Sequence, residues 1–222
     1  MAPVKTFKEQ KGHDKSNIRK ILEMAIFVKP KEDADTEITQ VWTQTDGLLI
    51  PAGYLPVGLV TKDDGASWSR DQDAADVTSM GYGEPTRRDI TSDVTGLGFT
   101  MQESKKTSME LYHGLDLSTV TTDTDGNFYF DKASLPAQRH YRVLAVGKDG
   151  DGPDAVYVLR WLPDAQVTEN GEQAWNDGDE VQYPATFTAY TDEKVGTSLR
   201  EIWGGPGLDH EAMGFDAPAV GG

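Results

Sequence analysis

The sequence has no cysteine, few basic residues and no long apolar run. The absence of cysteine among 222 residues excludes disulfide bonds and thiolate metal sites. The longest uncharged apolar tract, residues 47–60, is too short to span a bilayer, and Pro51 and Pro56 would break a helix there. The first residues are polar, so we expect no signal peptide. These absences predict a soluble protein without covalent cross-links or a membrane-spanning segment.

The basic residues are concentrated at one end of the chain. The sequence has 21 Lys and Arg against 37 Asp and Glu, a net charge of −16. Residues 1–31 nevertheless hold eight basic and three acidic residues, whereas residues 161–193 hold eight acids and no Lys or Arg. A basic arm and an acidic body are expected when the arm of one copy docks on the body of another. A disordered basic tail on an acidic globule is the alternative.

Turn residues and short apolar stretches indicate a mainly β chain. The 23 Gly and 11 Pro favour many turns over long helices. Strands are expected at residues 18–28, 57–61, 89–102, 128–130, 141–146, 155–162, 165–168 and 181–190. Strands at this spacing predict an antiparallel β-sandwich or barrel. One flanking α-helix is expected to begin after an N-cap at Ser104 and to end at Gly114. Its partial apolar face would be Met109, Leu111 and Tyr112.

The pattern of turns and charges divides the chain into three parts. Residues 1–17 are polar and predict an extended N-terminal arm. Residues 18–203 would form a single β-domain, and residues 204–222 a tail rich in Gly and Pro. Within the domain, residues 31–56 open with charged residues and end in an apolar tract punctuated by proline. A loop of this length is usually functional, so we expect it to be an interaction loop.

The sequence contains none of the usual catalytic or cofactor-binding patterns. The four histidines (His13, His113, His140 and His210) form no metal-binding spacing, and GxSxG and Walker motifs are absent. The Asp-rich turns at 123–127 and 149–154 offer oxygens at alternate positions, as calcium loops do, but lack the closing bidentate glutamate. Turn chemistry explains them equally well. We therefore expect no enzymatic activity, no cofactor and no metal.

Several segments in a fixed order carry a resemblance to a known family. In chain order they are GEPTRRDIT, FTMQESKKTSMELYHG, YRVLAVGKDG, LRWLPDAQVTENGEQAWNDGDEVQYPATFTAYTD and IWGGPG. From about residue 57 to residue 207 the chain resembles the major tail tube proteins of long-tailed non-contractile bacteriophages, particularly those infecting actinobacteria. The resemblance implies a β-sandwich subunit with a flanking helix and extended terminal arms and loops. It also implies hexameric rings that join their strands into an inner β-barrel and stack head to tail.

The same resemblance implies a function and a set of partners. The tube would conduct phage DNA into the host, with transient, non-specific passage of DNA and no membrane partner. Beyond further copies of the chain, the implied partners are the tape measure protein and the tail terminator and distal tail proteins. The implied location is the virion tail, and the host cytoplasm during assembly. The alternative is an extracellular or virion-surface β-sandwich module that binds calcium or glycans through Asp-rich loops and aromatic residues.

The candidate interface residues are charged or aromatic. Arg87 and Arg88 are the first candidates, because arginine suits bidentate contacts with carboxylates, although they could also be plain surface charges. Asp89 follows them directly in the sequence. The other candidates are the lysines of the N-terminal arm and one aromatic residue near the C-terminus: Lys5, Lys8, Lys11, Lys15 and Trp203.

Overall fold

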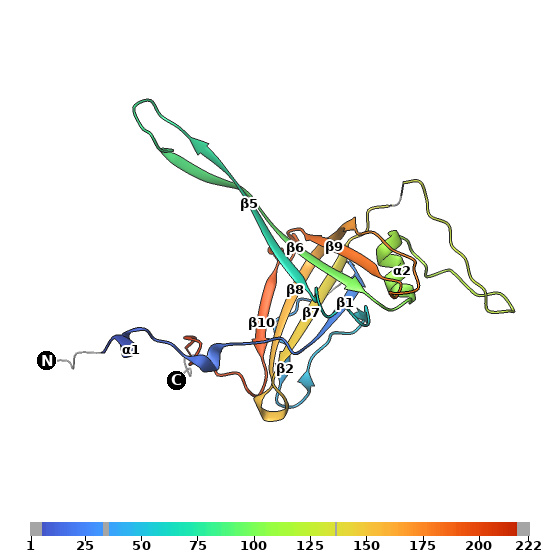
Figure 1. The fold of residues 1–222 in the computed structure, drawn as a ribbon, viewed down its shortest axis with the longest axis horizontal. Coiled ribbons are helices and arrows are strands. Elements are labelled where there is room, and N and C mark those ends of the chain that lie inside the picture. The colour runs from blue at the N-terminus through green and yellow to red at the C-terminus, as the bar shows by residue number, and fades with distance from the viewer. Residues whose placement is uncertain (1–5, 33–35, 136, 217–222) are drawn as a thin grey trace.

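Within the described residues, an antiparallel sheet curls into two packed layers with helix α2 at its side (Figure 1). The computed structural model describes residues 6–32, 36–135 and 137–216. The strand order is β4–β1–β7–β8–β9–β6–β5, with β10 also paired to β8, and β2 and β3 pair separately. The strands are β1 (Glu23–Pro30), β2 (Trp42–Thr43), β3 (Gly47–Leu48), β4 (Leu55–Pro56), β5 (Ser67–Val77), β6 (Arg87–Met101), β7 (Tyr141–Asp149), β8 (Val156–Asn170), β9 (Tyr183–Ala189) and β10 (Arg200–Gly204). The helices are α1 (Phe7–Gln10) and α2 (Lys106–His113), with 3₁₀ turns η1 (Lys15–Asn17) and η2 (Gly152–Asp154). The predicted mainly β, antiparallel fold with a flanking helix is confirmed.

Strand β8 belongs to both layers. Its residues 157–161 pair with β10, and its residues 165–170 pair with β9 along the same edge, while β7 occupies the other edge. The first layer is therefore β4, β1, β7, the first half of β8 and β10, and the second layer is the rest of β8, β9, β6 and β5. The two strands expected at 155–162 and 165–168 are a single strand. Pro163 lies beside a register shift in the β7–β8 pairing, where a missing amide is tolerated.

A large apolar core fills the space between the two layers. Alternate residues of β1 and β7 face it from the first layer, and Leu97 of β6 and Phe187 of β9 face it from the second. The rings of Phe99 and Phe187 stack with their centroids 5.7 Å apart. Leu111 of α2, 1 % exposed, covers one end of this core. The period-two alternation of β6 and β9 follows from this packing, because only one face of each strand is buried.

The outer face of the first layer is covered by residues 36–56. Ile38 and Val41 of this segment pack against Leu144, Leu159 and Trp161 in a second apolar cluster. The indole nitrogen of Trp161 also donates a hydrogen bond of 2.9 Å to the hydroxyl of Tyr54. The middle of the expected interaction loop is thus part of the subunit's own core. Its contact with other copies stays a prediction.

Helix α2 confirms the expected helix but begins one residue later than expected. The N-cap is Lys105, and Ser104 instead accepts a hydrogen bond of 2.9 Å from the hydroxyl of Tyr183, so the N-cap prediction was wrong. The C-terminal end is as expected: Gly114 has φ +65° and its amide donates to the carbonyl of Glu110. This left-handed conformation favours glycine. The buried face includes Leu111, as the pattern predicted.

Other differences from the expected strands arise where apolar content is a poor guide. Residues 57–61 form no strand, only a single bridge between Val60 and Met101, and residues 128–130 form none. Strand β1 begins at Glu23 rather than residue 18 and runs to Pro30. Strand β5, in which polar and charged residues predominate, was not predicted at all. No helix among the described residues is long and apolar enough to span a membrane.

Candidate assembly surface

The outer parts of β5 and β6 form a two-stranded ribbon that projects from the body. Strand β9 pairs with β6 only over residues 96–101, so residues 87–95 of β6 pair with β5 alone. We call residues 70–95 the β5–β6 arm. Figure 1 shows it extending away from both layers, and no other strand of the described residues pairs with it. An isolated two-stranded ribbon is at best marginally stable in water. The arm would therefore gain stability by packing on another surface.

Cross-strand polar contacts keep the two strands of the arm in register. At the base, Nε of Arg70 donates a hydrogen bond of 2.8 Å to Oδ1 of Asp93, and this contact holds the pKa of the Asp93 carboxyl below its usual value. Farther along, the hydroxyl of Ser92 donates to the carboxylate of Asp73 at 3.0 Å. Such exposed contacts contribute little stability, because water and salt screen them. They fix geometry more than they stabilise the ribbon.

The predicted residues Arg87, Arg88 and Asp89 lie on the outer half of this arm. Nε of Arg87 contacts Asp89 at 2.8 Å, and Nε of Arg88 lies 3.9 Å from Asp76. Both arginine side chains remain more than two thirds exposed, at 71 % and 72 %. Guanidinium groups that make one local contact keep further donors for a carboxylate of another molecule. Their position is compatible with an interface, and their role stays a prediction.

Large apolar side chains are exposed along the same outer half. They are Val77, Met80, Tyr82 and Ile90. Met80, at the turn between the strands, is fully exposed. Apolar side chains gathered on a projecting element are typical of surfaces that become buried on association. The arm thus combines an open strand edge, exposed cations and exposed apolar side chains in one element.

A cluster of charged side chains lies between strand ends of the body, and the sequence did not predict it. Nζ of Lys31 contacts Asp164 at 2.6 Å and Asp192 at 3.1 Å. Arg142, 2 % exposed, contacts Asp192 at 3.5 Å. The Nδ1 atom of His140 lies 2.6 Å from the other oxygen of Asp164. Buried charges require such pairing, because removing them from water costs several kcal/mol each.

The cluster shifts two pKa values in opposite directions. Burial alone would raise the pKa of Asp192, but hydrogen bonds from the Val195 amide and the Lys31 ammonium outweigh burial and lower that pKa. Burial would lower the pKa of Lys31, but hydrogen bonds to Asp164 and Asp192 raise it. Both shifts favour the charged forms, so Lys31 and Asp192 are ionised at neutral pH.

These shifts predict how the stability of the monomer depends on pH. The stabilisation from ionised Asp192 is complete above its unfolded pKa, near 3.8, and is lost as the pH falls through its lower folded pKa. The contribution of Lys31 is complete below 10.5 and is lost as the pH rises through its raised folded pKa. Urea unfolding over a pH series should show Asp192→Asn losing less stability than the unmodified chain on the acid side. Parallel acid limbs for the two proteins would contradict this assignment.

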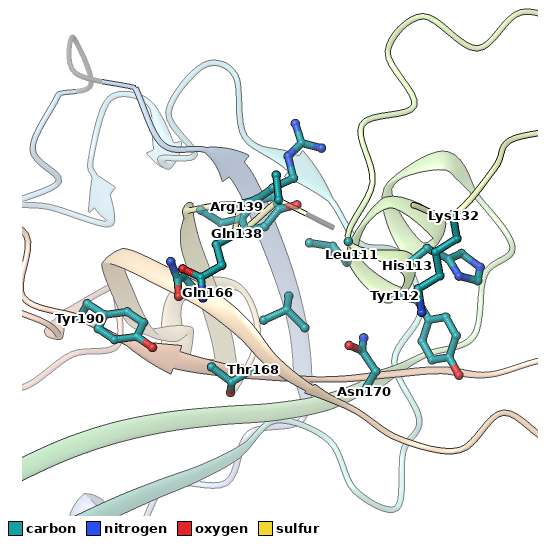
Figure 2. A pocket seen from close by; sticks show the side chains of 14 residues that line it. Leu111, Tyr112, His113, Lys132, Gln138, Arg139, Gln166, Thr168, Asn170 and Tyr190 are labelled. Atoms are coloured by element: carbon teal, nitrogen blue, oxygen red, sulfur yellow. The ribbon is translucent and has the colours of Figure 1, made fainter. Parts of the chain in front are cut away.

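A hollow of about 360 Å³ lies between the end of α2, the segment before β7 and the ends of β8 and β9 (Figure 2). Burial and the nearby charge of Lys132 lower the pKa of His113, which therefore lines the hollow as a neutral ring. Arg139 donates to the carbonyl of Leu115 and to Asp116 instead of pointing a free cation inward. The lining offers no nucleophile activated by a base.

The Asp-rich turn at 123–127 uses its oxygens within the turn. The carboxylate of Asp123 accepts hydrogen bonds from the side-chain amide of Asn127 and from the backbone amides of Asn127 and Asp125, which lowers its pKa. No group of three or more potential metal ligands occurs among the described residues. The turn chemistry expected of such a sequence accounts for this geometry.

Comparison with known families identifies the chain. A family described as "Phage tail tube protein" matches residues 12–201. The chain belongs to the phage tail tube protein family. This membership confirms the predicted resemblance to phage tail tube proteins, while the actinobacteriophage type stays a prediction, and it makes the chain a structural component of the virion tail and not an enzyme.

Two solved structures similar to this tail tube protein are those of a double mutant of Hcp1 from the E. coli EAEC 042 pathovar and of an Hcp protein. Their sequence identities are 11 % and 12 %, and both have a TM-score of 0.31. Each match covers 82 % of this chain and 98 % of the other. No curated protein matches the sequence.

The other predicted interface residues of the tail tube protein lie on separate elements. Lys5 is outside the described residues, and Lys8 lies in α1. Lys11 follows α1, and its ammonium lies 4.8 Å from the centre of the Phe7 ring. Lys15 is exposed in η1. Trp203 lies on β10, where its indole donates to Glu201 at 2.8 Å. The structure therefore does not bring these residues to the arm within one subunit.

The N-terminal and C-terminal segments of the tail tube protein meet each other. The side-chain amide of Asn17 donates a hydrogen bond of 2.6 Å to the carbonyl of Ala212. The backbone of Gly207 then ties the C-terminal segment to the body, because its amide donates to the carbonyl of Ala155 at 3.0 Å. A side chain at Gly207 would collide with the backbone of Asp154, so only glycine allows this approach. Part of the predicted tail is thus held against the subunit.

Proposed function

We propose that this tail tube protein self-assembles into hexameric rings that stack head to tail and form the tube through which phage DNA passes into the host. The observation that carries the proposal is the β5–β6 arm. It leaves the body as a ribbon with an open edge and exposed apolar side chains. An open edge is stabilised when it pairs with or packs on another chain, and closure into a ring removes it. A contact between unlike surfaces can repeat along a tube without limit.

The charge distribution supports the same assembly. The N-terminal segment is basic and the rest of the chain is strongly acidic, so the two regions of different copies attract each other. Figure 1 shows the N-terminal segment leaving the body on a different side from the arm. Two projecting elements on different sides give each subunit two separate means of contacting neighbours. Residues 31–56, through their exposed positions, and the C-terminal segment are further candidates for such contacts.

Further partners follow from the place of a tube in a tail. We propose that the ends of the tube contact a tail terminator and a distal tail protein, and that the lumen holds a tape measure protein before DNA passes. The tail would be of the long, non-contractile type, as in phages infecting actinobacteria, and the subunits would assemble in the host cytoplasm. DNA would pass without sequence-specific contacts, because the acidic body repels phosphates.

We expect the double substitution Arg87→Glu with Arg88→Glu to leave a folded monomer that does not form tubes. Removing charge pairs from an interface costs about 2 kcal/mol or more, which raises the critical concentration for assembly by about thirtyfold. Negative-stain electron microscopy and sedimentation over a concentration series would measure this. The matched control is Arg87→Lys with Arg88→Lys, which keeps both charges and should still assemble. Tubes of the Glu variant at the concentration that suffices for the unmodified chain would show that these arginines make no contact.

A further inference from the structure

The second layer has an outer face that no other part of the described chain covers. Gly98 of β6 lies between Ser67 of β5 and Thr186 of β9, and these three residues point away from the core. The next row repeats the pattern with Gly96 between Ser69 and Thr188. We call the whole set the threonine face. Its members are Ser67, Ser69, Asp71, Asp73, Ser92, Val94, Gly96, Gly98, Thr100, Thr168, Glu169, Pro184, Thr186 and Thr188.

The chemistry of this face is uniform. It consists mainly of hydroxyl side chains and glycines, with the three carboxylates of Asp71, Asp73 and Glu169 and no Lys or Arg. Neighbouring hydroxyls bond to each other across strands, as Thr168 and Thr188 do at 2.8 Å. The glycines leave space for the side chains beside them, since a Cβ atom at Gly96 would lie 2.5 Å from the hydroxyl of Ser69. The result is a polar surface of hydroxyls and glycines without Lys or Arg, with a hollow of about 280 Å³ beside Ser67, Glu169 and Thr186.

The two outer faces of the body differ in chemistry and in whether the chain covers them. The outer face of the first layer is apolar and is covered by residues 36–56 of the same chain. The outer face of the second layer is polar and bare, although its strands are as well buried on their inner side. A polar face needs no protein cover because it stays hydrated.

We propose that the threonine face lines the lumen of the tube and is the surface that passing duplex DNA meets. This rests on the proposed tube function. DNA binds proteins mainly by exchanging its condensed counterions for Lys and Arg, and this face has neither to offer. Its hydroxyls keep their water, and its carboxylates repel phosphates weakly. DNA would therefore slide along it without being held.

The threonine face also extends beyond the body. Asp71 and Asp73 on β5, with Ser92 and Val94 on β6, continue the same side of the strands onto the β5–β6 arm. An arm that reaches a neighbouring ring would carry this lining across the joint between rings. The lining of the lumen would then continue from ring to ring without Lys or Arg at the joints.

The cysteine-free sequence allows a direct test. Single variants Thr186→Cys and Ser69→Cys place a thiol on the threonine face, and Thr45→Cys places one in the exposed turn between β2 and β3, over the opposite face. Each variant is treated, as monomer and as tubes, with a small maleimide and with a maleimide on a particle too large to enter the tube. Monomers should react with both reagents at every position. In tubes, the two variants on the threonine face should lose reaction with the large reagent and keep reaction with the small one. Thr45→Cys keeps reaction with both reagents where its turn lies outside the tube, and loses both where residues 31–56 contact another copy.

Each other outcome has a distinct meaning. Reaction of the Thr186→Cys and Ser69→Cys tubes with the large reagent would place this face outside and overturn the inference while the tube function stands. Protection from both reagents, or folded variants that fail to assemble at both positions, would make the face a contact between copies and also overturn it. Failure of the unmodified chain to form tubes would instead count against the proposed function.

Discussion

A chain in which residues 74–91 are replaced by Asn-Gly is expected to fold normally and to form no tubes. Asp73 and Ser92 are paired across the two strands, so a two-residue turn can close the shortened ribbon in its own register. The deletion removes Arg87, Arg88 and the exposed apolar side chains of the arm, but keeps the contact between Arg70 and Asp93. Because the core contains no residue of the deleted part, the urea midpoint of the monomer should not change.

Electron microscopy and sedimentation of the shortened chain would measure the loss of assembly. The control is Ser92→Ala, which removes one hydrogen bond to Asp73 but leaves the arm at full length, and should form tubes. The shortened chain should also fail to extend tubes of the unmodified chain. Tubes of normal diameter from the shortened chain would rule out the arm as the main element of assembly.

The second large effect is expected from Asp192→Ala. Asp192 is 1 % exposed and is the shared carboxylate of Lys31 and Arg142. Its other oxygen accepts hydrogen bonds from the amides of Lys194 and Val195. Removing one partner of a buried ion pair leaves a buried charge uncompensated and costs about 3–5 kcal/mol. That is a large part of the total stability of an ordinary domain, about 5–15 kcal/mol.

Urea unfolding of the dilute monomer, followed by tryptophan fluorescence, would show this loss as a lower midpoint. The matched control is Asp93→Ala, which breaks the exposed pair with Arg70 and should lower the midpoint far less. Equal costs for the two variants would show that Lys31 and Arg142 find other compensation when Asp192 is absent.

The parts of the fold that were predicted are those where one face of an element is apolar. Strands β7 and β9 and the buried face of α2 follow from apolar residues at the period of a strand or a helix. Gly114 ends α2 because a left-handed residue is needed there, and that requirement is local. Local signals of this kind can be read without knowing the tertiary structure.

The parts that were missed depend on distant partners. Strand β5 is polar on both sides for most of its length, and its pairing with β6 alone makes it a strand. The apolar triplet at 128–130 predicted a strand, but no neighbouring strand receives it. Lys31, Arg142 and Asp192 are far apart in sequence and meet only where strand ends converge. In each case, contacts made in the folded chain outweigh the local structural preference of the sequence.

Three residues of the candidate assembly surface came from the sequence, and their role stays a prediction. The sequence singled out Arg87, Arg88 and Asp89, and the structure places all three on the projecting arm. The threonine face could not be predicted, because hydroxyl residues on different strands share a face only through the register of β5, β6, β8 and β9. A shift of one residue in any of these strands would turn its side chains to the other face.

The continuity of β8 through both layers has a mechanical consequence. A force that shears one layer past the other acts along an unbroken backbone, and it must also break the pairing of β8 with β7, β9 and β10. The two layers therefore resist being sheared past each other. When a tail built from such subunits flexes, the bending must be absorbed where copies touch and in the projecting segments, while the cross-section of the channel keeps its shape.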